Sequence, residues 1–61
     1  MPYIEVKAAE RRIDEQSARR VMTKLTDALC EALGEEVRDQ TWVVVEGVPG
    51  SRWGIGGEPL R

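Results

Sequence analysis

The 61-residue sequence contains no histidine and no phenylalanine, and it has a single cysteine, Cys30. One cysteine cannot form a disulfide within the chain, and the absence of histidine excludes the common Cys/His zinc sites. A chain this short buries only about 60% of its unfolded surface, and small domains usually gain stability from disulfides, a metal or self-association. The composition therefore predicts one domain, residues 1–61, that associates with other copies or with a partner chain.

The sequence also lacks an excess of charge of one sign and any long apolar run. Lys and Arg number 9, Asp and Glu number 11, and the formal net charge is −2. A nucleic-acid-binding domain would show a basic face, and a membrane-spanning helix would need about 18 consecutive apolar residues. No charged start followed by an apolar segment marks a secretory signal, and an unpaired thiol suits a reducing compartment. We expect a soluble cytoplasmic protein that binds neither nucleic acid nor membrane.

Two segments of the first half show clear periodicity. Residues 3–8 (YIEVKA) alternate between apolar and polar, which predicts a half-buried strand. From Glu15 to Leu33, apolar residues recur at spacings of three and four and form one helical stripe. Asp14 is a good N-cap residue, and Gly34 suits the end of the helix. Cys30 falls beside the stripe, and we interpret it as a passive helical residue because no histidine is present to activate it as a nucleophile.

The segment 41–45 (TWVVV) is a continuous run of β-branched and aromatic residues. Such a run is typical of a strand that is covered on both faces, as in a parallel sheet. Strand, helix and strand together predict one βαβ unit with a right-handed crossover. One helix covers only one face of a two-stranded sheet, so another copy of the chain is the simplest candidate to cover the other face.

The last segment, residues 47–61 (GVPGSRWGIGGEPLR), is rich in turn-forming residues. Gly47, Pro49 and Gly50 indicate a loop. The residues around the Gly56–Gly57 pair predict a short hairpin, or an arm that lies on a neighbouring chain. The GIGG sequence does not open a helix, so it has neither the dinucleotide-binding nor the P-loop context.

The chain begins Met-Pro-Tyr, and Pro2 allows two interpretations. Proline at the first residue of a strand costs no ladder hydrogen bond, so the residue has an ordinary structural explanation. If Met1 is removed, however, the Pro2 nitrogen becomes a secondary amine that can accept and release a proton. These residues by themselves leave both interpretations open.

Four segments in this order, MPYIEV, RRIDEQ, VVVE and RWGIGGEPL, make the chain resemble the 4-oxalocrotonate tautomerase family, whose short chains carry an N-terminal catalytic proline. The resemblance covers essentially the whole sequence. It implies an α+β fold, a tautomerase-like β-α-β unit with a short C-terminal hairpin that is assembled by oligomerisation. In this family the units pair into dimers, which usually form a hexamer. A dimer or trimer of the unit, and a hetero-oligomer with a paralogous subunit, are the other assemblies we consider.

The resemblance also implies a chemistry, a 1,3-proton transfer (keto–enol) on a small unsaturated 2-oxo or 2-hydroxy carboxylic acid, with no metal and no other cofactor. Pro2 would be the general base and acid once Met1 is removed, since desolvation and nearby guanidinium groups disfavour the cationic amine. Arg12, with Arg11 beside it, would hold the substrate carboxylate by paired hydrogen bonds. Trp53 would form a wall of the pocket and exclude water.

The chain departs from this resemblance at Thr41, where the best-studied members carry a second arginine that binds and polarises the substrate. A hydroxyl group cannot replace a bidentate cation. Either Arg38 or Arg52 substitutes, or the substrate differs, or a partner subunit supplies the arginine. The alternative function is that of a non-catalytic or partner-dependent subunit of a tautomerase-fold hetero-oligomer. A lyase or hydratase would need a water-activating group, for which the sequence shows no clear candidate.

Overall fold

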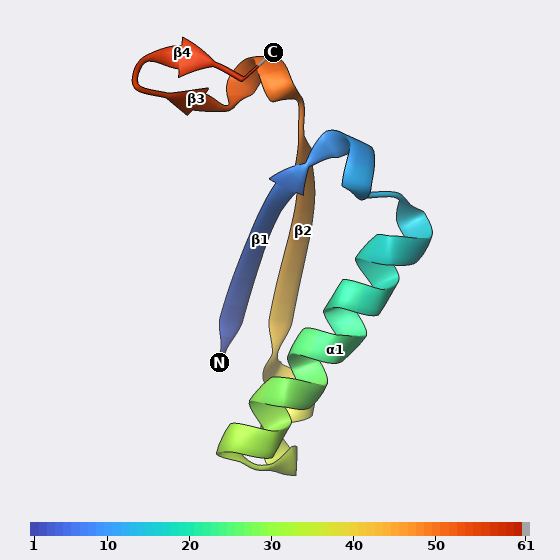
Figure 1. Ribbon diagram of the computed structural model, residues 1–61. Helices are drawn as coiled ribbons and strands as arrows, with labels where there is room; N and C mark the ends of the chain where they lie inside the picture. The colour runs from blue at the N-terminus through green and yellow to red at the C-terminus, as the bar shows by residue number, and fades with distance from the viewer. Residues whose placement is uncertain (61) are drawn as a thin grey trace.

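Two parallel strands and one helix form the body of the protein in a computed structural model, which describes residues 1–60 (Figure 1). Strand β1 (Tyr3–Ala9) pairs in parallel with β2 (Trp42–Val48), and helix α1 (Glu15–Leu33) connects them. The remaining elements are short: the 3-10 helices η1 (Glu10–Arg12), η2 (Glu35–Gln40) and η3 (Gly50–Arg52), and the strands β3 (Gly54–Ile55) and β4 (Glu58–Pro59). The expected βαβ unit with a C-terminal hairpin is confirmed.

Helix α1 begins and ends where the sequence predicts. The Asp14 carboxylate accepts a hydrogen bond from the backbone N–H of Ser17 at 2.7 Å, and the Ser17 hydroxyl oxygen accepts one from the N–H of Asp14 at 2.9 Å. This capping box satisfies two N–H groups of the first turn, and the bond from the Ser17 backbone lowers the pKa of Asp14. At the other end Gly34 has a φ of 110°, and its N–H donates to the Cys30 carbonyl at 2.8 Å.

One face of the sheet packs against α1, and Cys30, near the C-terminal end of α1, is buried. Among residues 1–60 it is the single buried residue, with 5% of its surface exposed. The interpretation that Cys30 lies beside the apolar stripe is therefore wrong. The helix is rotated so that Cys30 faces the sheet, whereas Met22 and Leu33 of the expected stripe remain 41% and 56% exposed.

The other face of the sheet, which we call the outer face, has no cover from residues 1–60. Tyr3, Trp42 and Val44 lie on it as exposed apolar side chains. Further along the same face, Lys7 forms ion pairs with Glu46 at 2.6 Å and with Glu5 at 3.3 Å. The pairing with Glu46 raises the pKa of Lys7 and lowers that of Glu46. The run of β2 was expected to be covered on both faces, and in the single chain it is covered on one.

Strand β2 is also longer than expected, because Gly47 continues it where the sequence suggested a loop. Gly47 pairs with Ala8 in the parallel register. A Cβ atom at Gly47 would lie 3.2 Å from both the Glu10 Cα and the Ile13 Cβ. The missing side chain thus lets η1 pack closely against β2, and this contact positions the turn that carries the two arginines.

The molecule is elongated, with extents of 43 × 25 × 14 Å and a radius of gyration of 14.2 Å. A compact chain of this length would have a radius of gyration of about 10 Å. The C-terminal segment extends past the end of the sheet, away from β1, β2 and α1 (Figure 1). The described part of the chain therefore leaves both the outer face and this segment without cover.

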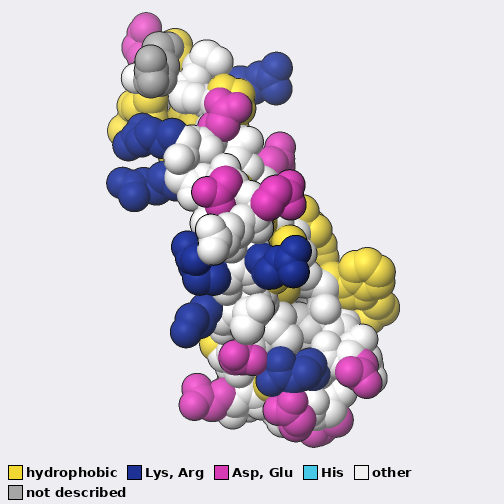
Figure 2. Space-filling view, turned by 90° about the vertical axis from the view of Figure 1, so that its right-hand side faces the viewer, with side chains coloured by type: hydrophobic (Ala, Val, Ile, Leu, Met, Phe, Trp, Pro, Cys, Tyr) yellow, Lys and Arg dark blue, Asp and Glu magenta, His cyan; other side chains and the backbone are white. Residues whose placement is uncertain are grey.

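The surface that carries α1 shows Lys and Arg interspersed with Asp and Glu, with no large patch of one sign (Figure 2). Hydrophobic side chains project at the edge of the same view. Within residues 1–60, no helix has the length and apolar character needed to cross a bilayer.

Candidate active site

The expected catalytic and binding residues lie at opposite ends of the sheet. Pro2 directly precedes β1, whereas Arg11 and Arg12 lie in η1, directly after it. A strand rises about 3.3 Å per residue, which separates Pro2 from Glu10 by roughly 26 Å. We call these two regions the proline end (residues 1–3 and 34–42) and the arginine end (residues 9–13 and 47–60). Within one chain, Pro2 cannot reach a ligand held at the arginine end.

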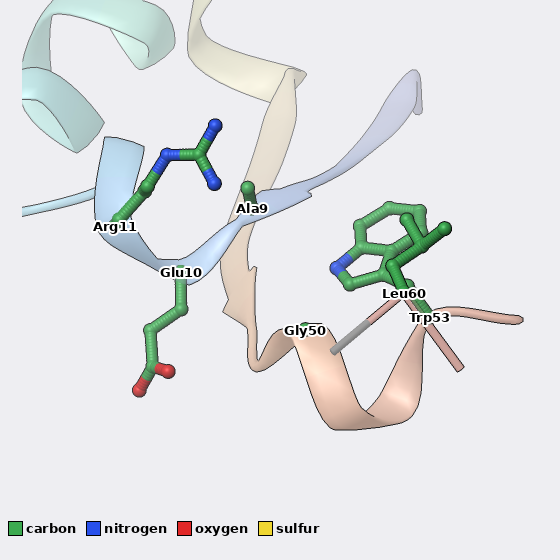
Figure 3. Close-up of a pocket in the computed structure, with 6 residues that line it drawn as sticks. All are labelled: Ala9, Glu10, Arg11, Gly50, Trp53 and Leu60. Atoms are coloured by element: carbon green, nitrogen blue, oxygen red, sulfur yellow. The ribbon is translucent and has the colours of Figure 1, made fainter.

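The arginine end contains a cavity of about 400 Å³, a volume suited to a small molecule. Its lining residues are Ala9, Glu10, Arg11, Gly50, Trp53 and Leu60 (Figure 3). Of the substrate-binding residues expected from the sequence, the structure brings Arg11 and Trp53 together. Arg12 is not among the lining residues.

Trp53 is held in place at both its side chain and its backbone. Its indole N–H donates to the carbonyl of Val48 at 3.0 Å, and its backbone N–H donates to Gly50 at 3.1 Å. The indole has one donor, so the ring offers only apolar surface to the cavity. In Figure 3 the side chains of Trp53 and Leu60 lie against each other on one side of Ala9.

Leu60 reaches the cavity because the hairpin folds back on Trp53. Gly56 and Gly57 have φ values of 61° and 87°, the two positive values that a type I′ turn requires. Counting outward from this turn pairs Ile55 with Glu58 and Gly54 with Pro59, and the Leu60 N–H then donates to Trp53 at 2.8 Å. Leu60 was not expected from the sequence as a site residue, although the same count along the sequence would have found it.

The turn that carries Arg11 is anchored from two sides. Gly47 allows it to pack on β2, and the Ser17 hydroxyl donates to the carbonyl of Arg12 at 3.1 Å. Among the described residues no carboxylate lies within ion-pair distance of the Arg11 guanidinium, so its five donors are available to a ligand. Glu10 was not expected from the sequence as a site residue. Its side chain leaves the turn in the direction opposite to Arg11 (Figure 3).

At the proline end, Pro2 is half-buried and fixed through its carbonyl group, which accepts a hydrogen bond from the N–H of Trp42 at 3.0 Å. The sheet therefore holds Pro2 without using its nitrogen. While Met1 is attached, that nitrogen belongs to a tertiary amide and has no basic lone pair. Met1 is 82% exposed.

Thr41 and Arg38 are also at the proline end, and both are engaged by their own chain. The Thr41 hydroxyl donates to the Val37 carbonyl at 2.7 Å. Arg38 donates from Nη1 to the Asp27 carboxylate at 2.9 Å and from Nε to Glu35, and these bonds raise its pKa.

Arg52, the other suggested substitute for a second arginine, lies in η3 at the arginine end. It lines a neighbouring hollow with Trp53 and Glu58, not the cavity that contains Arg11.

Comparison with known proteins supports this picture of the fold. A family model described as tautomerase enzyme matches residues 2–61. Among solved structures, the chain is similar to the crystal structure of DmpI from Helicobacter pylori, with a TM-score of 0.79 and 18% sequence identity over 97% of this chain and 95% of that chain. At this identity the likeness shows a shared fold. A comparison with curated proteins found no match.

Proposed function

Since the chain belongs to the tautomerase family, we propose that it is an isomerase that catalyses keto–enol proton transfer on a small unsaturated 2-oxo or 2-hydroxy carboxylic acid. The observation that carries this proposal is the cavity at the arginine end, which is lined by Arg11, with no ion-pair partner among residues 1–60, and by the apolar side chains of Trp53 and Leu60. Such a cavity suits an organic carboxylate, because it offers paired donors for the charged group and apolar contact for the rest.

Pro2 is the proposed proton-transfer residue, in the form that lacks Met1. Its neutral amine accepts the proton of the substrate 2-hydroxyl group while the electron pair moves to form the 2-oxo group. The resulting ammonium then returns a proton to the carbon at the far end of the former enol. Atoms and electrons balance, and the reaction needs no oxidant, metal or other cofactor. A positioned general base or acid of this kind contributes about 10²–10⁴-fold to a rate.

Arg11 is the proposed carboxylate-binding residue, with Arg12 adjacent to it in the same turn. A bidentate hydrogen bond from a guanidinium orients a carboxylate as well as neutralising it. Trp53 forms the apolar wall, and its hydrogen bond to Val48 keeps the ring in one orientation. Excluding water from this side strengthens the electrostatic interactions between the bound acid and the protein.

A complete site requires two copies of the chain, because Pro2 and the cavity lie at opposite ends of β1. We propose that the proline end of one copy meets the arginine end of another in a homo-oligomer. The uncovered outer face and the extended hairpin support such an assembly, since each exposes apolar side chains such as Trp42 and Ile55. A hexamer is the assembly we favour, and the unpaired thiol of Cys30 supports a cytoplasmic location.

One observation favours a second candidate, a partner-dependent or non-catalytic subunit. At the proline end, Arg38 is bound by two carboxylates and Thr41 donates to a backbone carbonyl, so neither is available to polarise a substrate. A paralogous chain that supplies a cation would restore this function in a hetero-oligomer.

The test begins with the intact mass of the purified protein, followed by ketonisation assays on phenylenolpyruvate and 2-hydroxymuconate. We expect a mass that lacks Met1, together with turnover of at least one substrate. Pro2→Ala is expected to lower kcat/KM by about 10²-fold or more, because alanine removes the secondary amine. Pro59→Ala is the matched control, since Pro59 is exposed and distant from Pro2 along the chain, and it is expected to retain activity.

Normal turnover by Pro2→Ala, or by protein that retains Met1, would contradict the proposal. A processed protein that turns over neither substrate, but becomes active when mixed with a paralogous subunit, would instead establish the second candidate.

A further inference from the structure

We propose that the cavity at the arginine end selects acids with a single carboxylate and an apolar tail, such as aryl-substituted 2-oxo acids, and discriminates against dicarboxylates. This inference rests on the proposed function, because it concerns the substrate class of the same site. It follows from which charges line the cavity and which are already engaged elsewhere.

The cavity offers one cation and one anion. Arg11 is the only Lys or Arg among the described residues that line it, and Glu10 is the one acidic residue among them. The rest of the lining comes from Ala9, Gly50, Trp53 and Leu60, which carry no charge. One carboxylate can bind Arg11, whereas a second one would lose water without gaining a cation.

The proline end, which would complete the site, does not offer a second cation. Arg38 already donates to both Asp27 and Glu35. Thr41 is neutral, and the hydrogen of its hydroxyl is used by the Val37 carbonyl. A ligand would have to displace two carboxylates from Arg38 before that guanidinium could bind it.

Two other cations, Lys7 and Arg52, are also placed elsewhere. Lys7 pairs with Glu46 and Glu5 on the outer face. Arg52 lines the neighbouring hollow together with Glu58, so a carboxylate that approaches it also meets a negative charge.

The negative charge of Glu10 further disfavours the binding of a dicarboxylic acid. A carboxylate in the lining repels the distal carboxylate of a dicarboxylic acid, but it has little effect on an aryl or alkyl tail that contacts Trp53 and Leu60. The same repulsion weakens as salt concentration rises, since both charges are accessible to solvent.

The deciding experiment measures equilibrium binding of two unreactive acids by calorimetry, 3-phenylpropanoate and adipate. We expect the processed wild-type protein to bind 3-phenylpropanoate at least about tenfold more tightly, because only its tail matches the apolar lining. Glu10→Gln is expected to tighten adipate binding several-fold at low salt and to leave 3-phenylpropanoate within about twofold. Glu31→Gln, which removes one exposed carboxylate from the helix, is the matched control and should change neither value.

Equal or tighter binding of adipate by the wild-type protein, no binding of either acid, or an unchanged ratio in Glu10→Gln would overturn the inference. Because binding is measured without turnover, these outcomes are independent of the reaction itself. If 3-phenylpropanoate binds preferentially but phenylenolpyruvate is not ketonised, the substrate class stands as a binding preference and the proposed reaction fails. Where both enols react, kcat/KM should favour phenylenolpyruvate, with the difference mainly in KM.

Discussion

The two ends of the sheet carry complementary parts of the proposed active site. The proline end holds the proposed proton-transfer residue, but its arginine is bound by carboxylates of its own chain. The arginine end holds a guanidinium group with no ion-pair partner among residues 1–60, and a largely apolar cavity, but Pro2 does not line that cavity. One chain therefore carries both halves of the proposed site, but the seven residues of β1 keep the two halves apart.

The largest effect should come from mixing two variants, each damaged at a different end. Pro2→Ala and Arg11→Ala are each expected to lose most activity. Refolded together in equal amounts, they should recover about a quarter of the wild-type activity, because random pairing joins an intact proline end to an intact arginine end in about one site of four. Steady-state ketonisation of the mixture measures this recovery.

Wild-type protein mixed with Pro2→Ala is the control for the mixing, and its activity should follow the fraction of intact Pro2. If mixed assemblies are present by native mass spectrometry and no activity returns, the two ends do not act in the same site.

Gly47→Ala should damage the arginine end alone. Its Cβ would press on the Cα of Glu10 and the side chain of Ile13, so the turn that carries Arg11 must shift. Overpacking of this kind costs about 1–3 kcal/mol, and we expect a several-fold higher KM for the carboxylate substrate with a smaller change in kcat. Gly54→Ala is the control, since its Cβ would meet only the Glu58 carbonyl at 3.6 Å. A stable Gly47→Ala protein with unchanged KM would contradict the role given to this contact.

Trp53→Phe should have a smaller effect at the same end. The change removes the indole donor to Val48, a bond worth about 1 kcal/mol, while keeping an aromatic wall. We expect a few-fold rise in KM and a modest loss of thermal stability. Trp42→Phe at the proline end is the comparison, because the Trp42 indole makes no hydrogen bond among residues 1–60. Equal changes in KM for the two variants would show that Trp53 has no special role.

The smallest effect concerns pH and the helix cap beside the arginine end. The pKa of Asp14 is lowered by its bond from Ser17, so its contribution to stability is complete above its unfolded value of about 3.8 and is lost as the pH falls through the lower folded value. The Tm should therefore decline as the pH falls below about 4 more steeply than in Asp14→Asn, which caps the helix without titrating. Circular dichroism at several pH values checks this, and identical slopes would contradict it.

Much of the fold was predictable because its signals are local. The helix from Glu15 to Leu33 follows from its period and from the caps at Asp14 and Gly34, and the hairpin follows from the Gly56–Gly57 pair. The extension of β2 through Gly47 was not predictable. A glycine there resembles a loop signal until the chain brings η1 against it, and only then does the lack of a side chain become an advantage.

The candidate site divides in the same way. Arg11 and Trp53 were expected from the resemblance, and the structure places both in one cavity. Glu10 and Leu60 were not, because nothing in their immediate sequence indicates chemistry. Cys30 was placed beside the apolar stripe, since the spacing of apolar residues leaves the centre of the stripe uncertain. The rotation of the helix is decided by how its side chains fit the sheet.

By itself, the sequence determined the order and type of the elements, the helix caps, the two-residue turn and the residue types available for chemistry. These depend on backbone conformations and on neighbours within a few positions along the chain. Only the tertiary structure decided that Pro2 and Arg11 lie at opposite ends of β1, that Arg38 is bound by Asp27 and Glu35, and that no carboxylate of residues 1–60 pairs with Arg11. Which charges neutralise each other depends on contacts between distant segments, and those contacts exist only once the chain has folded.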